Sequence, residues 1–188
     1  MTTAATRLMT TDELLTLPDD EKRRWLIHGE LREQDVTIRN RFHSITMARH
    51  TGELYIWWAK QSLPRGEIVC GEAVVRLPGE PPTTIGVDVA YVPPDVIVRQ
   101  TDDTTSIEGV PTLIVEILSP SDKIEDLDEM VNAYGTAEVP LVWLVDPRDR
   151  TVTIYRPSGE PVLVNAEQEL TGGDVLPGFR VPVAKLFE

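Results

Sequence analysis

Polar and apolar positions along the chain predict two substantial helices. Residues 40–63 contain no proline, begin with Asn40 as a cap and are followed by Pro64, which predicts one long helix. A second helix is predicted over residues 122–136, after a turn at Ser119-Pro120-Ser121. Helical spacing in the first helix predicts a buried apolar stripe, formed by Ile45, Ala48, Leu54, Ile56 and Trp57.

Groups of β-branched, aromatic and other apolar residues between turn residues predict the strands of a sheet. Residues 112–118 are apolar on both faces, as expected for a central strand. The predicted strands span residues 25–27, 31–38, 67–70, 73–77, 85–92, 112–118, 141–145 and 151–155. The remaining elements are a short helix from Thr11 to Leu17, a charged connector at 19–24, loops at 78–84 and 100–109, and a tail from residue 175 that packs on the body.

This order of elements predicts the fold class α/β (mixed), with a central, partly antiparallel sheet flanked by helices, rather than a doubly wound fold. The 188 residues suit one domain, residues 1–188. No apolar run approaches the roughly 20 residues that a membrane span requires, and the N-terminal segment does not resemble a signal peptide. Cys70, the single cysteine, cannot form an internal disulfide. We therefore expect a cytoplasmic protein without membrane association, in which Cys70 fills a small space in the core.

The charge distribution is uneven along the chain. A formal net charge of −13 argues against a protein that coats nucleic acid through bulk electrostatics. Residues 22–65 are nevertheless net basic and contain all three histidines, His28, His43 and His50. This segment either forms a solvated surface, which needs no ligand, or faces nucleic acid beside an acidic site.

Two acids interrupt apolar predicted strands. Asp88 lies in the middle of residues 85–92, and Glu116 lies between Val115 and Ile117. An ionised carboxylate in such a strand is costly unless it is paired, hydrogen-bonded or bound to a cation. If the two strands are neighbours, both carboxylates can bind one hard cation, Mg²⁺ or Mn²⁺. The alternative is that each acid meets a backbone amide or an arginine at a strand end.

The two acids belong to a series of motifs that extends over nearly the whole chain. The series comprises Leu26-Ile27-His28-Gly29-Glu30-Leu31, Val87-Asp88-Val89, Val115-Glu116-Ile117-Leu118-Ser119-Pro120-Ser121, Asp126, Tyr134, Trp143-Leu144-Val145-Asp146-Pro147 and Leu176-Pro177-Gly178-Phe179. It resembles the bacterial putative restriction endonuclease family (Uma-type) of the PD-(D/E)XK nuclease superfamily. The resemblance implies a restriction-endonuclease-like core in which Asp88 and Glu116 bind the metal, and it places His43 where the family commonly has histidine.

The sequence departs from the family pattern at two positions. Met130 stands where a lysine is common, and Trp25 stands where an acid is common in the early hairpin. Such a lysine would orient the attacking water or stabilise the charge that grows on the phosphate, which a thioether cannot do. Lys123, seven residues before Met130 and on the same helix face, is the candidate replacement. The alternative is that Lys123 only solvates the helix surface.

Together these features favour a metal-dependent endonuclease that hydrolyses DNA. The candidate catalytic residues are Asp88, Glu116 and Lys123, and the candidate substrate-binding residues are His43, Ser119 and Arg41. Met130, Trp25 and the acidic net charge favour an alternative, a degenerate nuclease fold that binds DNA or a protein partner without cutting. The resemblance suggests a homodimer, because nucleases of this type often need two sites to cut two strands.

Overall fold

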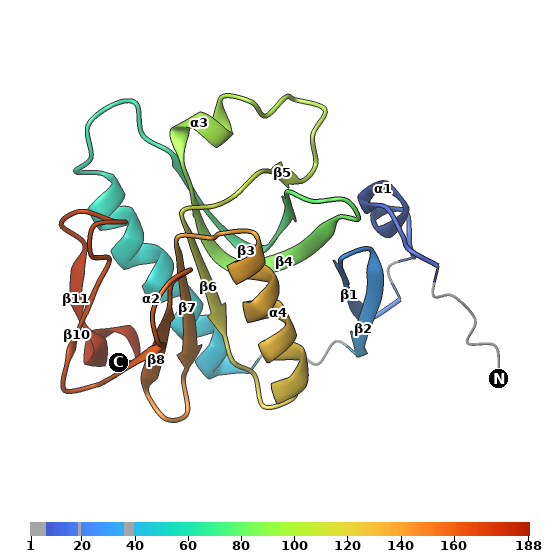
Figure 1. Ribbon diagram of the computed structural model, residues 1–188. Coiled ribbons are helices and arrows are strands. Elements are labelled where there is room, and N and C mark those ends of the chain that lie inside the picture. Colours follow the sequence, from blue (N-terminus) through green and yellow to red (C-terminus); the bar gives the residue numbers. More distant parts are fainter. Residues whose placement is uncertain (1–6, 19, 36–39) are drawn as a thin grey trace.

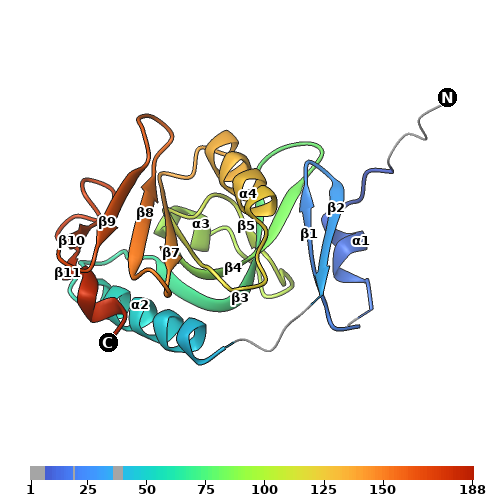
Figure 2. The same cartoon turned by 90° about the horizontal axis from the view of Figure 1, so that it is seen from below.

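The computed structural model describes residues 7–18, 20–35 and 40–188. A nine-stranded sheet forms its centre, with the long helix α2 on one face and α4 on the other (Figures 1 and 2). The strands of this sheet are β1 (Lys22–Ile27), β2 (Glu30–Asp35), β3 (Glu67–Leu77), β4 (Thr83–Val92), β5 (Ile107–Glu108), β6 (Leu113–Ile117), β7 (Leu141–Asp146), β8 (Thr151–Tyr155) and β9 (Val162–Asn165). The other elements are α1 (Thr11–Leu15), α2 (Arg41–Trp58), α3 (Pro94–Ile97), α4 (Ile124–Thr136), the small sheet of β10 (Glu169–Thr171) and β11 (Arg180–Pro182), and the 3₁₀ helix η1 (Val183–Leu186).

The sheet is mixed, which confirms the predicted fold class. Its main path runs β2-β1-β4-β6-β7-β8-β9, and β3 pairs with the other edge of β4 and with β5. The β6–β7 and β3–β5 pairs are parallel, and the remaining pairs are antiparallel. The β6–β7 pair is parallel because α4 connects the two strands in a crossover.

Two apolar clusters hold the helices on the sheet. The α2 cluster contains Leu54 and Trp57 of α2, packed with Val115, Trp143 and the C-terminal tail residue Phe179. This contact confirms that the tail packs on the body. The α4 cluster joins side chains of α4 to β1, β3, β4, β6 and β7, and its largest members are Trp25, Ile27, Leu77, Ile85, Ile114, Met130 and Tyr134. Burial of each large apolar side chain stabilises the folded chain by about 1.5–3 kcal/mol.

The buried face of α2 differs from the predicted stripe. Asn40 caps the helix as expected, since its side chain accepts a hydrogen bond from the backbone N–H of His43. Leu54 and Trp57 are buried, but the other stripe residues, Ile45, Ala48 and Ile56, are exposed. The rest of the buried face carries His43, Thr46 and His50. The prediction was wrong there because it assigned burial to apolar residues, whereas the sheet accepts polar ones on this face.

The early hairpin forms as predicted, with different limits. His28 and Gly29 both have positive φ, as a two-residue hairpin turn requires. β1 begins at Lys22, inside the predicted connector, and β2 ends at Asp35. Residues 36–38 of the predicted second strand lie outside the described residues.

Other expectations are corrected by the sheet pairing. Cys70 is exposed and is not a core residue. The predicted loop at 78–84 ends early, because Thr83 and Thr84 already belong to β4. Strands β9, β10 and β11 had no clear signal in the sequence pattern. None of the helices formed by the described residues could serve as a transmembrane span.

Candidate functional site

The central sheet forks along one edge of β4. On that edge β4 pairs with β1 at Thr84 and with β6 from Val89 to Tyr91. The intervening residues 85–88 face the space between β1 and β6. Buried backbone groups at such a fork need partners other than a neighbouring strand. The fork is therefore a place where polar side chains can be buried at low cost.

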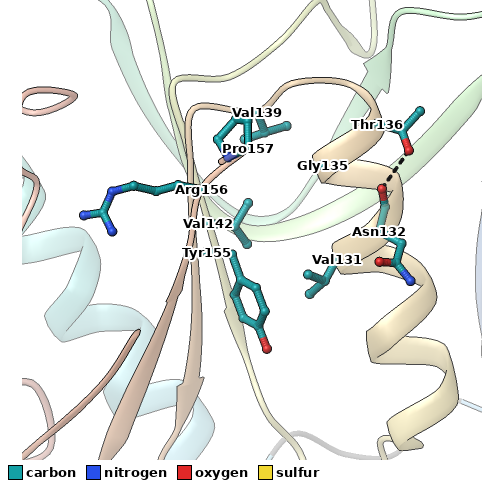
Figure 3. Close-up of a pocket in the computed structure, with 9 residues that line it drawn as sticks. All are labelled: Val131, Asn132, Gly135, Thr136, Val139, Val142, Tyr155, Arg156 and Pro157. Carbon is teal, nitrogen blue, oxygen red and sulfur yellow. Dashed lines mark hydrogen bonds between the residues drawn. The ribbon is translucent and has the colours of Figure 1, made fainter. Parts of the chain in front are cut away.

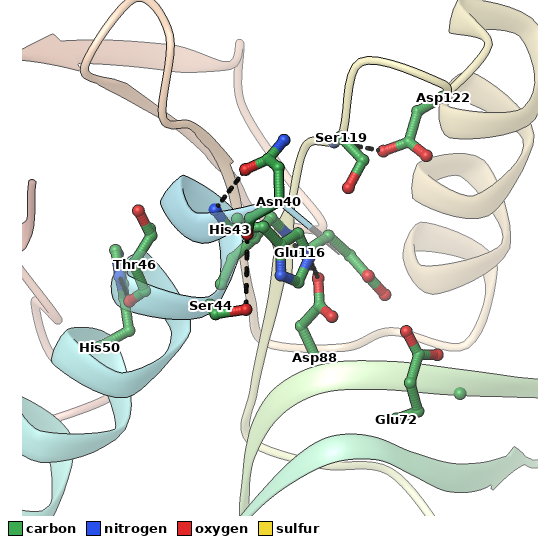
Figure 4. Close-up of polar contacts among 12 residues, drawn as sticks. Asn40, His43, Ser44, Thr46, His50, Glu72, Asp88, Glu116, Ser119 and Asp122 are labelled. Carbon is green, nitrogen blue, oxygen red and sulfur yellow. Dashed lines mark hydrogen bonds and ion pairs between the residues drawn. The ribbon is translucent and has the colours of Figure 1, made fainter. Parts of the chain in front are cut away.

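Asp88 lies at this fork and is 2% exposed. Its Oδ2 atom accepts a hydrogen bond of 2.8 Å from the backbone N–H of Ile117, at the end of β6. The Nε2 atom of His43, on α2, lies 3.2 Å from the same oxygen. Figure 4 shows His43 directed from α2 towards Asp88. The strand end and the helix together fix the position of this carboxylate.

Glu116 occupies the position after Val115, whose partner in β4 is Val89, so it lies beside Asp88 across the two strands. It is 4% exposed, and its Oε1 atom accepts a hydrogen bond from the hydroxyl of Tyr134 on α4. Burial raises the pKa of Glu116, and the charge of Asp88 raises it further. Arg23 and the Tyr134 hydrogen bond oppose this shift. The structure thus brings the two predicted acids together, with negative charge that is only partly compensated.

Arg23 and Glu72 complete the polar cluster at the fork. Arg23 Nη2 lies 3.9 Å from Glu116 Oε2 and donates a 2.9 Å hydrogen bond to the carbonyl oxygen of Gly86. Its Nε atom lies 3.4 Å from Glu72 Oε2, on β3. Sequence reasoning missed both residues. Arg23 had one available signal, since it lies two residues before Trp25 and so on the same face of a strand.

The donor set suits a weakly coordinated hard cation. Within the residues that the structure describes, no group of three or more His, Cys, Asp or Glu side chains could hold a metal ion. Mg²⁺, however, is commonly bound through one or two carboxylates and keeps several waters. Asp88 and Glu116 match that requirement, and the unfavourable ionisation of Glu116 is a reason for a cation to bind there.

The other candidate residues lie at different distances from the acids. The backbone N–H of Ser119 donates to Asp122 Oδ2, and the charge of Asp122 also raises the pKa of Glu116, so this turn borders the site. Lys123 is exposed at the N-cap of α4, and no contact links it to either acid. Arg41 is exposed and packs over the ring of Phe42, with Cζ 5.1 Å from the ring centroid.

The two positions that depart from the family pattern are both in the apolar core. Met130 is 5% exposed and Trp25 is 2% exposed, and both belong to the α4 cluster. Met130 lies one helical turn before Tyr134, the residue that binds Glu116. The two departing positions are therefore filled by buried apolar side chains of the α4 cluster.

A pocket on the other side of α4 does not belong to this site. It has a volume of about 400 Å³ and lies between α4 and β8 (Figure 3). Its lining comprises Val131, Asn132, Gly135, Thr136, Val139, Val142, Tyr155, Arg156 and Pro157. None of the acids at the fork contributes to it.

Comparison with known proteins finds one matching family model and a similar solved structure. The model of the family Uma2, described as "Putative restriction endonuclease", matches residues 11–184. The fold is similar to that of a putative nuclease of the group DUF820 from Anabaena variabilis ATCC 29413, with a TM-score of 0.77 and 19% sequence identity. The similarity covers 95% of this chain and 97% of that one. Curated proteins give no match.

Proposed function

We propose that this chain, which belongs to the putative restriction endonuclease family Uma2, hydrolyses phosphodiester bonds of DNA with a divalent cation held by Asp88 and Glu116. One observation carries the proposal. Two buried carboxylates from neighbouring strands meet at the sheet fork, and burial together with mutual repulsion disfavours the ionisation of Glu116. A bound cation would offset this repulsion. A fold that needs no cation has little reason to bury both acids.

The residues of the chain have separable roles in this proposal. Asp88 and Glu116 bind the cation through their carboxylate oxygens. His43 and the backbone N–H of Ile117 hold the Asp88 carboxylate in one orientation. Tyr134 does the same for Glu116. A divalent cation supplies a Lewis acid for the phosphate and lowers the pKa of water.

The decisive experiment measures cleavage of plasmid DNA and of single-stranded DNA with Mg²⁺ or Mn²⁺. We expect cleavage by the wild-type chain and a loss of at least about 100-fold in Asp88→Asn, because this change removes a charged ligand without changing size. Asp95→Asn is the matched control, since Asp95 is exposed on α3 and pairs with Arg99 at 3.8 Å. Cleavage that survives in Asp88→Asn would refute the assignment.

A second candidate function is supported by Met130 and Trp25. Both are packed as core residues of the α4 cluster, so two charges typical of the family are absent from these positions. A chain that binds DNA but does not cut it would have this composition. The same assay separates the two functions: DNA binding without any product that depends on Asp88 would favour the binding module.

A further inference from the structure

Among the residues that the structure describes, Arg23 places a cation at the fork, and several contacts fix the position of its side chain. Arg23 contacts the Gly86 carbonyl, Glu116 and Glu72 through its Nε and Nη2 atoms. Its Cζ atom lies 5.8 Å from the ring centroid of Trp25. Its side chain is 22% exposed, so solvent and ligands can reach it. No contact among the described residues uses Nη1, which leaves that end of the guanidinium available.

A bulge in β3 positions the acid that holds Arg23. The register between β3 and β4 shifts between Cys70 and Ala73, and the bulged residues Gly71 and Glu72 have φ of 86° and 62°. Positive φ is unfavourable for a residue such as glutamate and is often found near functional sites. The bulge directs the Glu72 side chain towards the acids of β4 and β6 (Figure 4).

Gly86 provides the space for this arrangement. A Cβ atom at position 86 would lie 2.9 Å from Glu72 Oε2. A side chain there would push Glu72 away from Arg23. The bulge, the glycine and the ion pair therefore form one local structure whose result is the placement of the Arg23 guanidinium beside Glu116.

We propose that Arg23 is the catalytic cation of the site and binds the phosphate that is cleaved, while Glu72 is a positioning residue that acts through Arg23. This inference rests on the proposed function. Phosphodiester hydrolysis benefits from a fixed positive group at the phosphate. Met130 has no charge, and Lys123 is exposed on the surface without a contact to the acids. Arg23 takes the place of the missing lysine from strand β1 instead of helix α4, and its planar group suits phosphate oxygens.

The test compares Arg23→Met and Arg23→Lys with Arg24→Met. Arg24 is the matched control because it is the next residue of β1 and is held by Asp20 and Glu33, away from the acids. Cleavage is measured with Mn²⁺, and Mn²⁺ affinity is measured by calorimetry. Binding of a fluorescein-labelled single-stranded oligonucleotide is measured in Ca²⁺ at several salt concentrations.

We expect Arg23→Met to cleave roughly 100-fold more slowly while it still binds Mn²⁺, with Arg23→Lys between this variant and the wild type. The slope of log affinity against log salt should fall by about one in Arg23→Met and stay unchanged in Arg24→Met. A purely structural role for Arg23 would not change that slope. Glu72→Gln should slow cleavage in the wild type and have little further effect in Arg23→Met.

The outcomes separate this inference from the proposed function. Cleavage and salt slope equal to wild type in Arg23→Met would overturn the role of Arg23 and leave the nuclease intact. A wild-type chain that does not cut, but binds the oligonucleotide in an Arg23-dependent way, would overturn the nuclease and retain the phosphate contact. A wild-type chain that neither cuts nor binds would overturn both.

Discussion

The two faces of the central sheet differ in the number of polar side chains that the covering helix buries. On the α2 face, His43, Thr46 and His50 are buried together with apolar residues, and His43 reaches Asp88. On the α4 face, the helix contributes Met130 and Tyr134 to a largely apolar cluster, and the hydroxyl of Tyr134 donates a hydrogen bond to Glu116. Each face therefore supplies a group that orients one of the acids, but the helix on the α4 face packs mainly through apolar side chains.

The largest effect on stability should come from placing a charged side chain in the apolar cluster under α4. Met130→Lys places an ammonium group in the apolar cluster, and we expect it to lower the free energy of unfolding by roughly 3–5 kcal/mol. The double variant Met130→Lys/Trp25→Glu should lose at least about 1 kcal/mol less free energy of unfolding than the sum of the two single variants, if the lysine and the glutamate form an ion pair. Urea unfolding measures both quantities.

The control for this pair is Ile124→Lys, on the same helix but 72% exposed, which should change stability by less than about 0.5 kcal/mol. A Met130→Lys variant as stable as the control would show that the α4 face tolerates charge. The contrast between the two faces would then be lost.

The buried His50 on the α2 face should make the free energy of unfolding depend on pH. Burial lowers the pKa of His50 to about 4, although the Thr46 carbonyl that accepts its Nδ1 hydrogen bond opposes the shift. Between pH 6.5 and about 4 the unfolded chain therefore binds a proton that the folded chain does not. The contribution of His50 is complete above pH 6.5 and is lost as the pH falls towards 4, by roughly 3 kcal/mol in total.

Glu116 affects the free energy of unfolding with the opposite sign. Its pKa is raised in the folded chain, so its stabilising contribution is lost as the pH rises above its pKa in the unfolded chain. The measurement therefore compares urea unfolding of the wild type and of His50→Leu from pH 4 to 7. We expect the difference between the two chains to change across this range. A constant difference would mean that the pKa of His50 is the same in the folded and the unfolded chain.

A smaller effect should follow from removing the one polar contact that α4 makes to an acid. Tyr134→Phe deletes the hydroxyl that donates to Glu116, and we expect a loss of about 2 kcal/mol in the free energy of unfolding. Tyr155→Phe is the control, because Tyr155 is half-buried on β8. Equal stability of the two variants would show that Glu116 does not depend on α4.

Much of the fold could be predicted because its signals are local. The central strand, both long helices and the hairpin turn follow from apolar grouping, the Asn40 cap and the pair His28-Gly29. The long helix α2 nevertheless ends at Trp58, before the predicted limit set by Pro64. Strands β9, β10 and β11 are short or mostly exposed, so they leave little apolar pattern. Their pairing depends on distant partners, which periodicity does not report.

Only the part of the site that has a local signal in the sequence could be predicted. Asp88 and Glu116 stand out because an acid in an apolar strand is costly, and the structure brings them together. Arg23 and Glu72 look like ordinary surface residues in the sequence. Only the fork and the bulge in β3 bring them to the acids, and both features depend on strand pairing that the residue pattern does not reveal.

The sequence alone determined that two acids are embedded in apolar strands and that the family's lysine and hairpin acid are absent from their usual positions. Apolar periodicity and residue chemistry are sufficient for those conclusions. The tertiary structure decided which face of α2 is buried, that Met130 and Trp25 belong to the core, and that Arg23 lies beside Glu116. These features depend on contacts between segments far apart in the chain, and the free energy of such contacts is set by the assembled sheet.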